Sequence, residues 1–301
     1  MLNATRTPAE KRAALAAALR GGGLLRFVGA YAPVVAMMIE EAGFDGVYMG
    51  SSTLSADLGL PDIGLITLTE AAQRGRQIAR ATDLPALIDV DTGFGEAVNV
   101  ARTVRELEEA GLAACHLEDQ VNPKRCGHLD NKAVVPLEAM VEKIRAAVAA
   151  RRDDNFRIVA RTDAKAIEGM EAAIARARAY VAAGADVIFP EALHDEQEFA
   201  DFRAAIDVPL LANMTEFGKS PLLPAGTLER LGYNIVIYPA TTQRLALFAV
   251  EDGLRQLRED GGQTGMLNRL QNRQRFYDII GYQDYTAFDR SVAGYFGGER
   301  E

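Results

Sequence analysis

The chain is poor in cysteine, histidine and long apolar runs. Its 301 residues contain 2 cysteines and 3 histidines, and so few cysteines in a chain of this length build no disulfide framework. No run of about 18 apolar residues is present, which excludes a membrane-spanning helix of ordinary length. The segment 1–22 lacks the apolar core and cleavage site of a signal peptide and is typical of an amphipathic helix. We therefore expect a cytoplasmic protein.

Positive charge is also in deficit. The formal net charge is -9, so we expect neither nucleic acid nor an anionic membrane as a partner. Anionic small molecules stay possible as substrates because local cations decide their binding. The apolar fraction of 49% supports a sizeable core. Since no linker, repeat or low-complexity segment interrupts the chain, we expect one domain over residues 1–301.

Short apolar segments alternate with helical patterns along the chain. Many are nearly continuous in apolar residues, which is typical of parallel strands buried on both faces. Eight strand–helix units predict an α/β fold of the (β/α)8 TIM-barrel type. The alternative is a doubly wound open sheet, but the glycines at 21–23 precede the first strand and cannot form its phosphate loop. The expected strands are 24–30, 46–51, 85–91, 113–119, 156–163, 186–192, 209–215 and 234–240.

The segment from about 263 to 301 lies beyond the eighth unit and is aromatic-rich with a helical pattern. We expect these C-terminal helices to cover a barrel end or to be exchanged between subunits, in a homotetramer built as a dimer of dimers.

Polar side chains occur where the predicted strands end. In a barrel these ends meet at one face, where catalytic residues lie. Asp89 and Asp91 are spaced i, i+2 and share one face, and with Glu118 they offer the oxygen ligands that Mg²⁺ prefers. The polar residues at the ends of the later strands are Arg161 and Asp163, Glu191, and Asn213 and Thr215. For any one of these pairs, a solvated strand end is the competing interpretation.

The histidines and the first cysteine fit a zinc site poorly. His116, His128 and His194 show no ligand spacing. We interpret His116 as a core histidine within its strand. Cys115 precedes His116 and therefore points to the opposite face of the strand. We expect it to point toward the helices and to be buried and structural.

The segment EDQVNPKRCGHLDNK (118–132) places Cys126 among basic residues. Lys124, Arg125 and His128 beside a thiol predict a lowered pKa and a role in proton transfer. An inert loop cysteine is the alternative. Glycine and proline breaks predict that this loop is mobile without ligand and closes over substrate. Tyr48, at the end of the second strand, is a candidate base or simply a packed tyrosine.

Several segments together resemble the isocitrate lyase/phosphoenolpyruvate mutase superfamily over essentially the whole chain. KRCGH is specific to its lyase branch, because phosphonomutases and the oxaloacetate-type hydrolases and decarboxylases lack this motif. The segments are LGLPDIG (58–64), VDTGFG (90–95), NVARTV (99–104), HLEDQ (116–120), KRCGH (124–128), ARTDA (160–164), FPEA (189–192), NMTEFG (213–218) and YPATTQR (238–244).

The resemblance implies a Mg²⁺-dependent carbon–carbon lyase, for which Mn²⁺ can substitute, that splits the tricarboxylate 2-methylisocitrate into pyruvate and succinate in propionate breakdown. It implies Asp89 and Asp91 as metal ligands, Asp62 and Glu118 as holders of metal-bound water, and Cys126 as the acid. Lys124, Arg125 and His128 accompany the thiol. The implied substrate contacts are Gly127, Arg161, Glu191, Asn213, Met214, Thr215, Arg244 and Arg273, with Phe189, Ile237 and Pro239 facing the extra methyl group.

One loop departs from the family pattern. Gly50, Ser51 and Ser52 stand where the lyases usually have Ser-Gly-Gly, and we assign them to the substrate site. Isocitrate and 2,3-dimethylmalate are alternative substrates for the same site, although full isocitrate lyases carry an insertion that is absent here. A phosphonomutase or oxaloacetate decarboxylase fits less well because of KRCGH. A non-catalytic barrel that serves as a binding protein is the alternative from another class.

Overall fold

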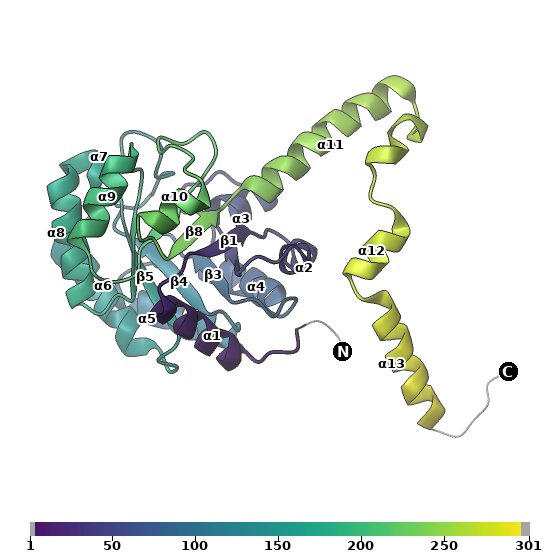
Figure 1. Cartoon of the computed structure of the whole chain (residues 1–301), viewed down its shortest axis with the longest axis horizontal. Helices are drawn as coiled ribbons and strands as arrows, with labels where there is room; N and C mark the ends of the chain where they lie inside the picture. The colour runs from purple at the N-terminus through teal and green to yellow at the C-terminus, as the bar shows by residue number, and fades with distance from the viewer. Residues whose placement is uncertain (1–3, 296–301) are drawn as a thin grey trace.

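Eight parallel strands form one sheet that closes on itself in the computed structural model, which describes residues 4–295 (Figure 1). The strand order is β6-β5-β4-β3-β2-β1-β8-β7, and a parallel bridge between Ile188 and Leu210 joins its two edges. The prediction of a (β/α)8 barrel is confirmed, and the open sheet is excluded. The strands are β1 (Leu25–Gly29), β2 (Gly46–Met49), β3 (Ala86–Asp89), β4 (Ala114–Glu118), β5 (Arg157–Thr162), β6 (Val187–Pro190), β7 (Leu211–Asn213) and β8 (Ile235–Tyr238).

Helices surround the barrel and follow it. Local signals fix several of their starts: Thr7 with Glu10 and Thr67 with Glu70 form capping boxes at α1 and α4. The helices are α1 (Pro8–Gly21), α2 (Pro33–Glu41), α3 (Ser51–Asp57), α4 (Leu68–Ala79), α5 (Ala97–Glu109), α6 (Leu137–Ala150), α7 (Lys165–Glu168), α8 (Met170–Ala182), α9 (Glu196–Ala205), α10 (Ala225–Arg230), α11 (Thr241–Asp260), the 3-10 helix η1 (Thr264–Arg269), α12 (Arg273–Ile279) and α13 (Tyr282–Tyr295).

The core has two layers, because successive strand residues point to opposite faces. Cys115 is buried in the layer between strands and helices, as its strand parity predicted. His116 points the other way, into the barrel, beside the Tyr48 and Phe189 rings. Helix α1 closes the N-terminal end of the barrel, where Leu15 and Leu19 join the inner layer.

The C-terminal helices extend away from the barrel (Figure 1). The departure begins at α11, earlier than the predicted boundary near 263, because α11 buries no residue against its own chain. Its exposed apolar side chains include Leu245, Leu247, Phe248, Val250 and Leu254. Helix α12 returns to the barrel through an ion pair between Arg275 and Glu41. We call residues 241–295 the C-terminal arm.

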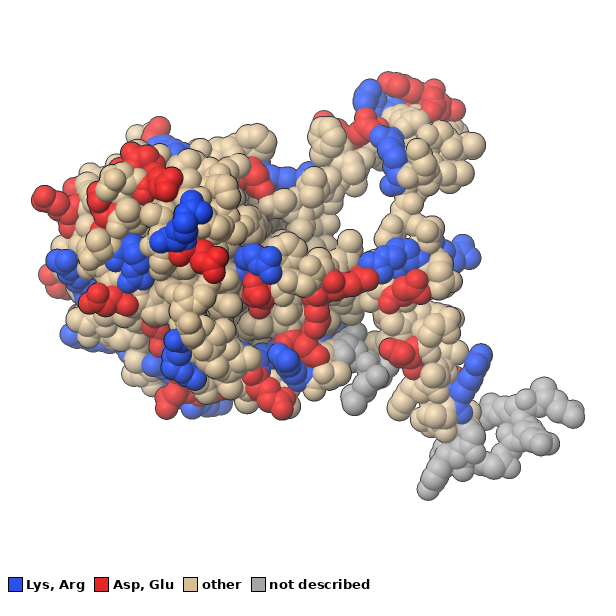
Figure 2. Space-filling view, in the orientation of Figure 1, with Lys and Arg blue, Asp and Glu red and all other residues tan. Residues whose placement is uncertain are grey.

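The predicted ranges 1–22 and 263–301 each run past the described residues, at 1–3 and 296–301. No helix within residues 4–295 is long and apolar enough to cross a membrane. On the face shown in Figure 2, acidic and basic side chains are interspersed over the barrel without a large patch of one sign.

Candidate active site

The strand ends bring two buried aspartates together at the barrel mouth. Asp89 closes β3, and Asp91 follows it with a left-handed backbone (φ 49). Asp89 Oδ1 accepts a hydrogen bond from Asp91 N at 2.9 Å. Asp89 Oδ2 accepts one from Ser51 Oγ at 2.9 Å and one from Ser51 N at 3.3 Å. The Asp89 carboxylate is therefore oriented by the start of α3 and by the backbone of Asp91 rather than by solvent.

The Lys124 ammonium lies among these acids. Its Nζ is 2.8 Å from Asp91 Oδ1 and also contacts Asp62 Oδ1 and Ser51 Oγ. Burial and then the Asp89 charge raise the pKa of Asp91 to about 6, although Lys124 opposes them. Burial would likewise raise the pKa of Asp89, but the charges of His116, Lys124 and Arg161 outweigh it and bring the value to about 2. Lys124 is thus turned toward the acids.

Arg161 lies at the centre of a second acidic group. Its guanidinium is 2.9 Å from Asp163, 3.1 Å from Glu118 and 3.3 Å from Glu191. One cation cannot neutralise three carboxylates, and Glu118 is the least supported because neither of its oxygens accepts a hydrogen bond. Burial raises the pKa of Glu118 well above its usual range despite Arg161. For Glu191, Arg161 and His128 outweigh burial and hold the pKa well below its usual range.

The loop of residues 120–132 is closed over this second group. Gly127 lies so close that a Cβ there would be 2.4 Å from Arg161 Nη2 and 2.4 Å from Glu191 Cγ. His128 Nε2 is 3.0 Å from Glu191 Oε1, while its Nδ1 accepts a hydrogen bond from Lys219 N at 2.9 Å. This pattern assigns the proton to Nε2, so His128 tethers two loops.

The expected lowering of the Cys126 pKa is wrong. Burial raises the pKa of the thiol, and the nearby Glu191 carboxylate adds to it. The backbone N–H of His128 and the Arg161 charge lower the pKa without offsetting burial. The sequence neighbours do not act as flanking cations, because Lys124 points to Asp62 and Asp91 and the Arg125 side chain is exposed. A protonated thiol suits a group that gives up a proton better than one that attacks as a thiolate.

Tyr48 and His116 form a buried pair inside the barrel. The Tyr48 hydroxyl is 2.9 Å from His116 Nε2, and His116 Nδ1 is 3.7 Å from Asp89 Oδ1. Burial and then the Asp89 charge raise the pKa of Tyr48 well above its usual range, whereas burial lowers that of His116 to about 4. Tyr48 is therefore a protonated phenol in this environment and a weak candidate for the base.

The apolar residues assigned to the methyl group lie on β6 and at β8, two strands separated by β7. Phe189 and Ile237 belong to the inner layer of the barrel, and Pro239 is buried just past β8. Arg161 stacks on the Phe189 ring, 5.2 Å from its centroid. These contacts place an apolar wall beside the cationic centre.

Only some of the predicted site residues after β7 and after β2 lie at the barrel mouth. Asn213 Nδ2 donates to Glu191 at 3.3 Å. The Met214 side chain is buried in the layer facing the helices, and Thr215 is partly buried. Gly50 and Ser51 are buried, while Ser52 is exposed. The Ser51 hydroxyl donates a hydrogen bond to Asp89 and accepts one from Lys124.

Two predicted arginines lie apart from the acids. Arg244 is 47% exposed at the start of α11, 3.5 Å from Glu216 and above the Phe217 ring. Arg273 is exposed on α12 in the C-terminal arm. Within one chain, the structure does not bring Arg273 to the barrel mouth.

The donor set fits Mg²⁺. Five carboxylates at the mouth contact three cationic side chains (Lys124, Lys132 and Arg161), and Asp89 adds a sixth carboxylate, so negative charge is in excess. The five are Asp62, Asp91, Glu118, Asp163 and Glu191. Within residues 4–295, no three His, Cys, Asp or Glu side chains are arranged to hold a metal ion. Mg²⁺ takes one or two protein carboxylates and fills its other positions with water and substrate oxygen, so Asp89 and Asp91 suffice.

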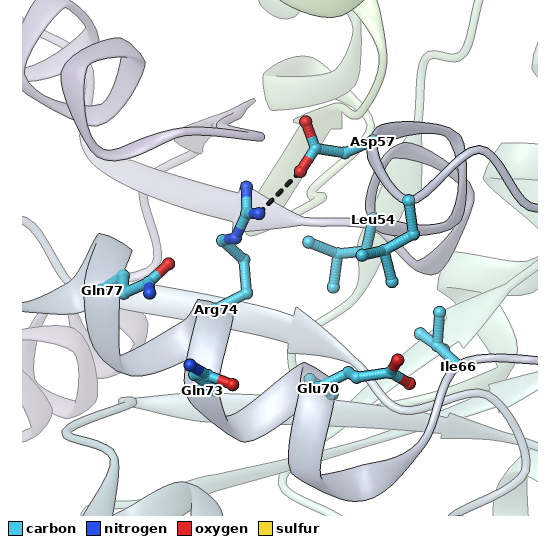
Figure 3. Close-up of a pocket in the computed structure, with 9 residues that line it drawn as sticks. Leu54, Asp57, Ile66, Glu70, Gln73, Arg74 and Gln77 are labelled. Carbon is cyan, nitrogen blue, oxygen red and sulfur yellow. Dashed lines mark ion pairs between the residues drawn. The ribbon is translucent and has the colours of Figure 1, made fainter.

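Two surface cavities differ in their relation to this site. One of about 500 Å³ is bordered by Asp91, Thr92 and Asn122 and adjoins the aspartate pair. The other lies between α3 and α4, where Arg74 reaches Asp57 at 2.6 Å (Figure 3). None of the predicted site residues lines this second cavity.

Sequence reasoning missed residues that act behind the site. Asp119 is buried and accepts hydrogen bonds from Thr162 Oγ1, Tyr180 Oη and Asp163 N, at 2.8, 2.8 and 2.9 Å. Lys132 holds the loop of residues 120–132 from its far end. Asp119 is the last residue of a predicted strand, as Asp163 is, and this position is the signal that pointed to it.

Comparison with known proteins agrees with this architecture. The model of the family "Phosphoenolpyruvate phosphomutase" matches residues 15–258. The chain belongs to this family, within the isocitrate lyase/phosphoenolpyruvate mutase superfamily. A Corynebacterium glutamicum protein, "Probable 2-methylisocitrate lyase 1", is 59% identical over 291 residues, which are 96% of this chain and 95% of that protein.

Two solved structures show the same fold. A crystal structure of 2,3-dimethylmalate lyase superposes with a TM-score of 0.89 at 32% identity, covering 99% of this chain and all (100%) of that one. Phosphonopyruvate hydrolase in complex with oxalate and Mg²⁺ superposes with a TM-score of 0.86 at 32% identity, covering 95% of this chain and 99% of the other.

Proposed function

We propose that this chain is a Mg²⁺-dependent lyase that cleaves 2-methylisocitrate to pyruvate and succinate in propionate breakdown. One observation carries the proposal: the partly buried Cys126 thiol, whose pKa is raised, is held on a loop closed over Arg161 and Glu191, and the Asp89–Asp91 pair lies at the same barrel mouth. The relative at 59% identity is named for this activity.

The residues divide the chemistry between them. Asp89 and Asp91 would hold Mg²⁺, and Asp62 and Glu118 would bind the water molecules on the metal. We expect that Mn²⁺ can substitute for Mg²⁺. When bound, the metal supplies Lewis-acid stabilisation of the hydroxy acid as it becomes a keto acid. Arg161 pairs with a substrate carboxylate, for which its planar fork is suited.

The bond changes balance without an external reagent. A base removes the proton of the substrate hydroxyl, the carbon–carbon bond breaks, and the hydroxyl carbon becomes the pyruvate carbonyl. The electron pair of the broken bond passes to the succinate carbon. The Cys126 S–H gives that carbon its proton and is left as a thiolate, which is reprotonated before the next turnover.

A second candidate substrate is 2,3-dimethylmalate. The likeness to the solved 2,3-dimethylmalate lyase covers the whole fold, and the apolar wall of Phe189, Ile237 and Pro239 accepts a methyl group in either case. Isocitrate is the third candidate. The KRCGH segment argues against a phosphonomutase, and the set of Asp89, Asp91, Cys126 and Arg161 argues against a non-catalytic binding protein.

A substrate panel tests the proposal. Methylisocitrate, isocitrate and dimethylmalate are each incubated with enzyme and Mg²⁺, and pyruvate, succinate and glyoxylate are measured. We expect the highest kcat/KM with methylisocitrate, loss of activity in EDTA, and recovery with Mg²⁺ or Mn²⁺. Asp89→Ala should lose metal binding in a titration that needs no substrate. Full activity in exhaustively chelated enzyme contradicts the metal assignment.

We also propose that the C-terminal arm is exchanged between copies of the chain in a homotetramer. Its exposed apolar face has no counterpart on its own barrel, and contiguous exposed apolar surface of this extent is typical of an interface. Exchange would let Arg273 approach the mouth of another barrel.

A further inference from the structure

The loop that carries Cys126 ends at Lys132, whose ammonium group lies in the barrel mouth. The Lys132 side chain is 2% exposed. Its Nζ donates to the Gly127 carbonyl and to Asp163 Oδ1, the latter at 2.8 Å. A lysine buried to this degree is held by its partners, because an unpaired ammonium in such a place is costly.

Asp163 links this contact to the framework of the site. It accepts two hydrogen bonds from Arg161, at 2.9 and 3.2 Å. Its backbone N–H donates to Asp119 Oδ1 at 2.9 Å. Lys132 therefore joins the loop of residues 120–132 to the framework of Arg161, Asp163 and Asp119, and Gly127 is the point at which the loop is held.

We propose that Lys132 is a positioning residue that holds the Gly127 carbonyl, directly after Cys126, so that the loop stays closed over Arg161 and Glu191, and that it thereby sets where the thiol lies. The proposal rests on the proposed function only for the identity of the reaction. The close approach of Gly127 to Arg161 and Glu191 supports the proposal. Because there is little free space, only a narrow range of loop positions allows the Gly127 carbonyl to bind Lys132 without a clash with Arg161.

Another tether serves as a matched comparison. Lys219 Nζ contacts Asp130 on the same loop, but the Asp130 side chain is 82% exposed. Exposed ion pairs contribute little to stability in water, whereas a buried hydrogen bond to a charged group contributes more. Asp130→Asn thus alters the same loop without removing a buried contact.

The test measures exposure of the thiol and turnover together. Wild type, Lys132→Met and Asp130→Asn are treated with iodoacetamide in the presence of Mg²⁺, and modification of Cys126 is followed by peptide mass spectrometry with buried Cys115 as reference. We expect Lys132→Met to be alkylated about 10- to 100-fold faster, the scale of one buried hydrogen bond to a charged group. We expect kcat to fall by a similar factor while KM changes little.

Two results overturn the proposal: alkylation at the wild-type rate in folded Lys132→Met, or equal acceleration in Asp130→Asn. Should Lys132→Met not fold, Lys132→Gln keeps a neutral donor to the Gly127 carbonyl and should show a smaller increase, and an unchanged rate there also overturns it. Alkylation needs no substrate. A chain that cleaves nothing in the panel therefore refutes the proposed function while the role of Lys132 is still decided.

Discussion

The Cys126 thiol stays protonated for a reason that its sequence neighbours do not reveal. Burial penalises the thiolate, and the Arg161 charge is shared among three carboxylates. A positioned general acid contributes about 10²–10⁴-fold to a rate. We therefore expect Cys126→Ser to lower kcat by about 10²-fold or more, with Mg²⁺ binding and thermal unfolding unchanged. Measured kcat close to wild type would remove Cys126 from the mechanism.

The pH dependence of the thiol follows from the direction of its shift. Because the pKa of Cys126 is raised, the thiol keeps its proton through neutral pH and loses it only above the range of an exposed cysteine. We expect slow alkylation of the free enzyme at neutral pH and a rate that rises into the alkaline range, measured by mass spectrometry beside a model thiol. Rapid alkylation near neutral pH would restore the low-pKa interpretation.

We expect substrate choice to depend on the apolar wall of Phe189, Ile237 and Pro239. One methyl group in an apolar pocket discriminates by about 10- to 200-fold, so we expect methylisocitrate to exceed isocitrate in kcat/KM by that range. Ile237→Phe should fill the methyl space and narrow or reverse the preference. Ile237 is buried, and a larger core residue often costs stability, so thermal unfolding is measured beside kinetics. A wild type that already prefers isocitrate contradicts the assignment of these residues.

At the scale of elements, the pattern of apolar runs was sufficient to predict the barrel. Each of the eight strands lies within its predicted segment, because buried parallel strands are apolar over their full length. Strand parity also placed Cys115 and His116 on opposite faces. The predicted ends ran too far, since Asp91, Asp119 and Asp163 belong to loops just past the strands.

Side-chain direction within loops was not predictable in this way. Lys124, Arg125 and Lys132 are all cations of one segment, yet one pairs with Asp62, one is exposed and one reaches Asp163. The directions of Lys124 and Lys132 depend on carboxylates that follow β2, β3 and β5, which only the closed barrel brings near. Arg273 lies on α12, away from the mouth of its own barrel, and we propose that assembly brings it to another, which no local pattern describes.

At the scale of the whole molecule, the C-terminal arm carries the expected interface. Phe248 on α11 is 77% exposed. We expect Phe248→Asp to yield smaller species in analytical ultracentrifugation and to lower activity, because Arg273 would no longer approach a neighbouring site. Glu259→Gln, an exposed change on the same helix, is the control. A tetramer that persists in Phe248→Asp, or a wild type that is monomeric, contradicts the exchange.

The position of helix α1 restricts how substrate enters the enzyme and how products leave it. Since Leu15 and Leu19 close the N-terminal end of the barrel, substrate and both products must pass through the opposite mouth, beneath the loop of residues 120–132. One molecule arrives and two leave by the same route, so the loop would have to open at least once in each catalytic cycle. The frequency of its opening therefore sets an upper limit on turnover, however fast the carbon–carbon bond breaks.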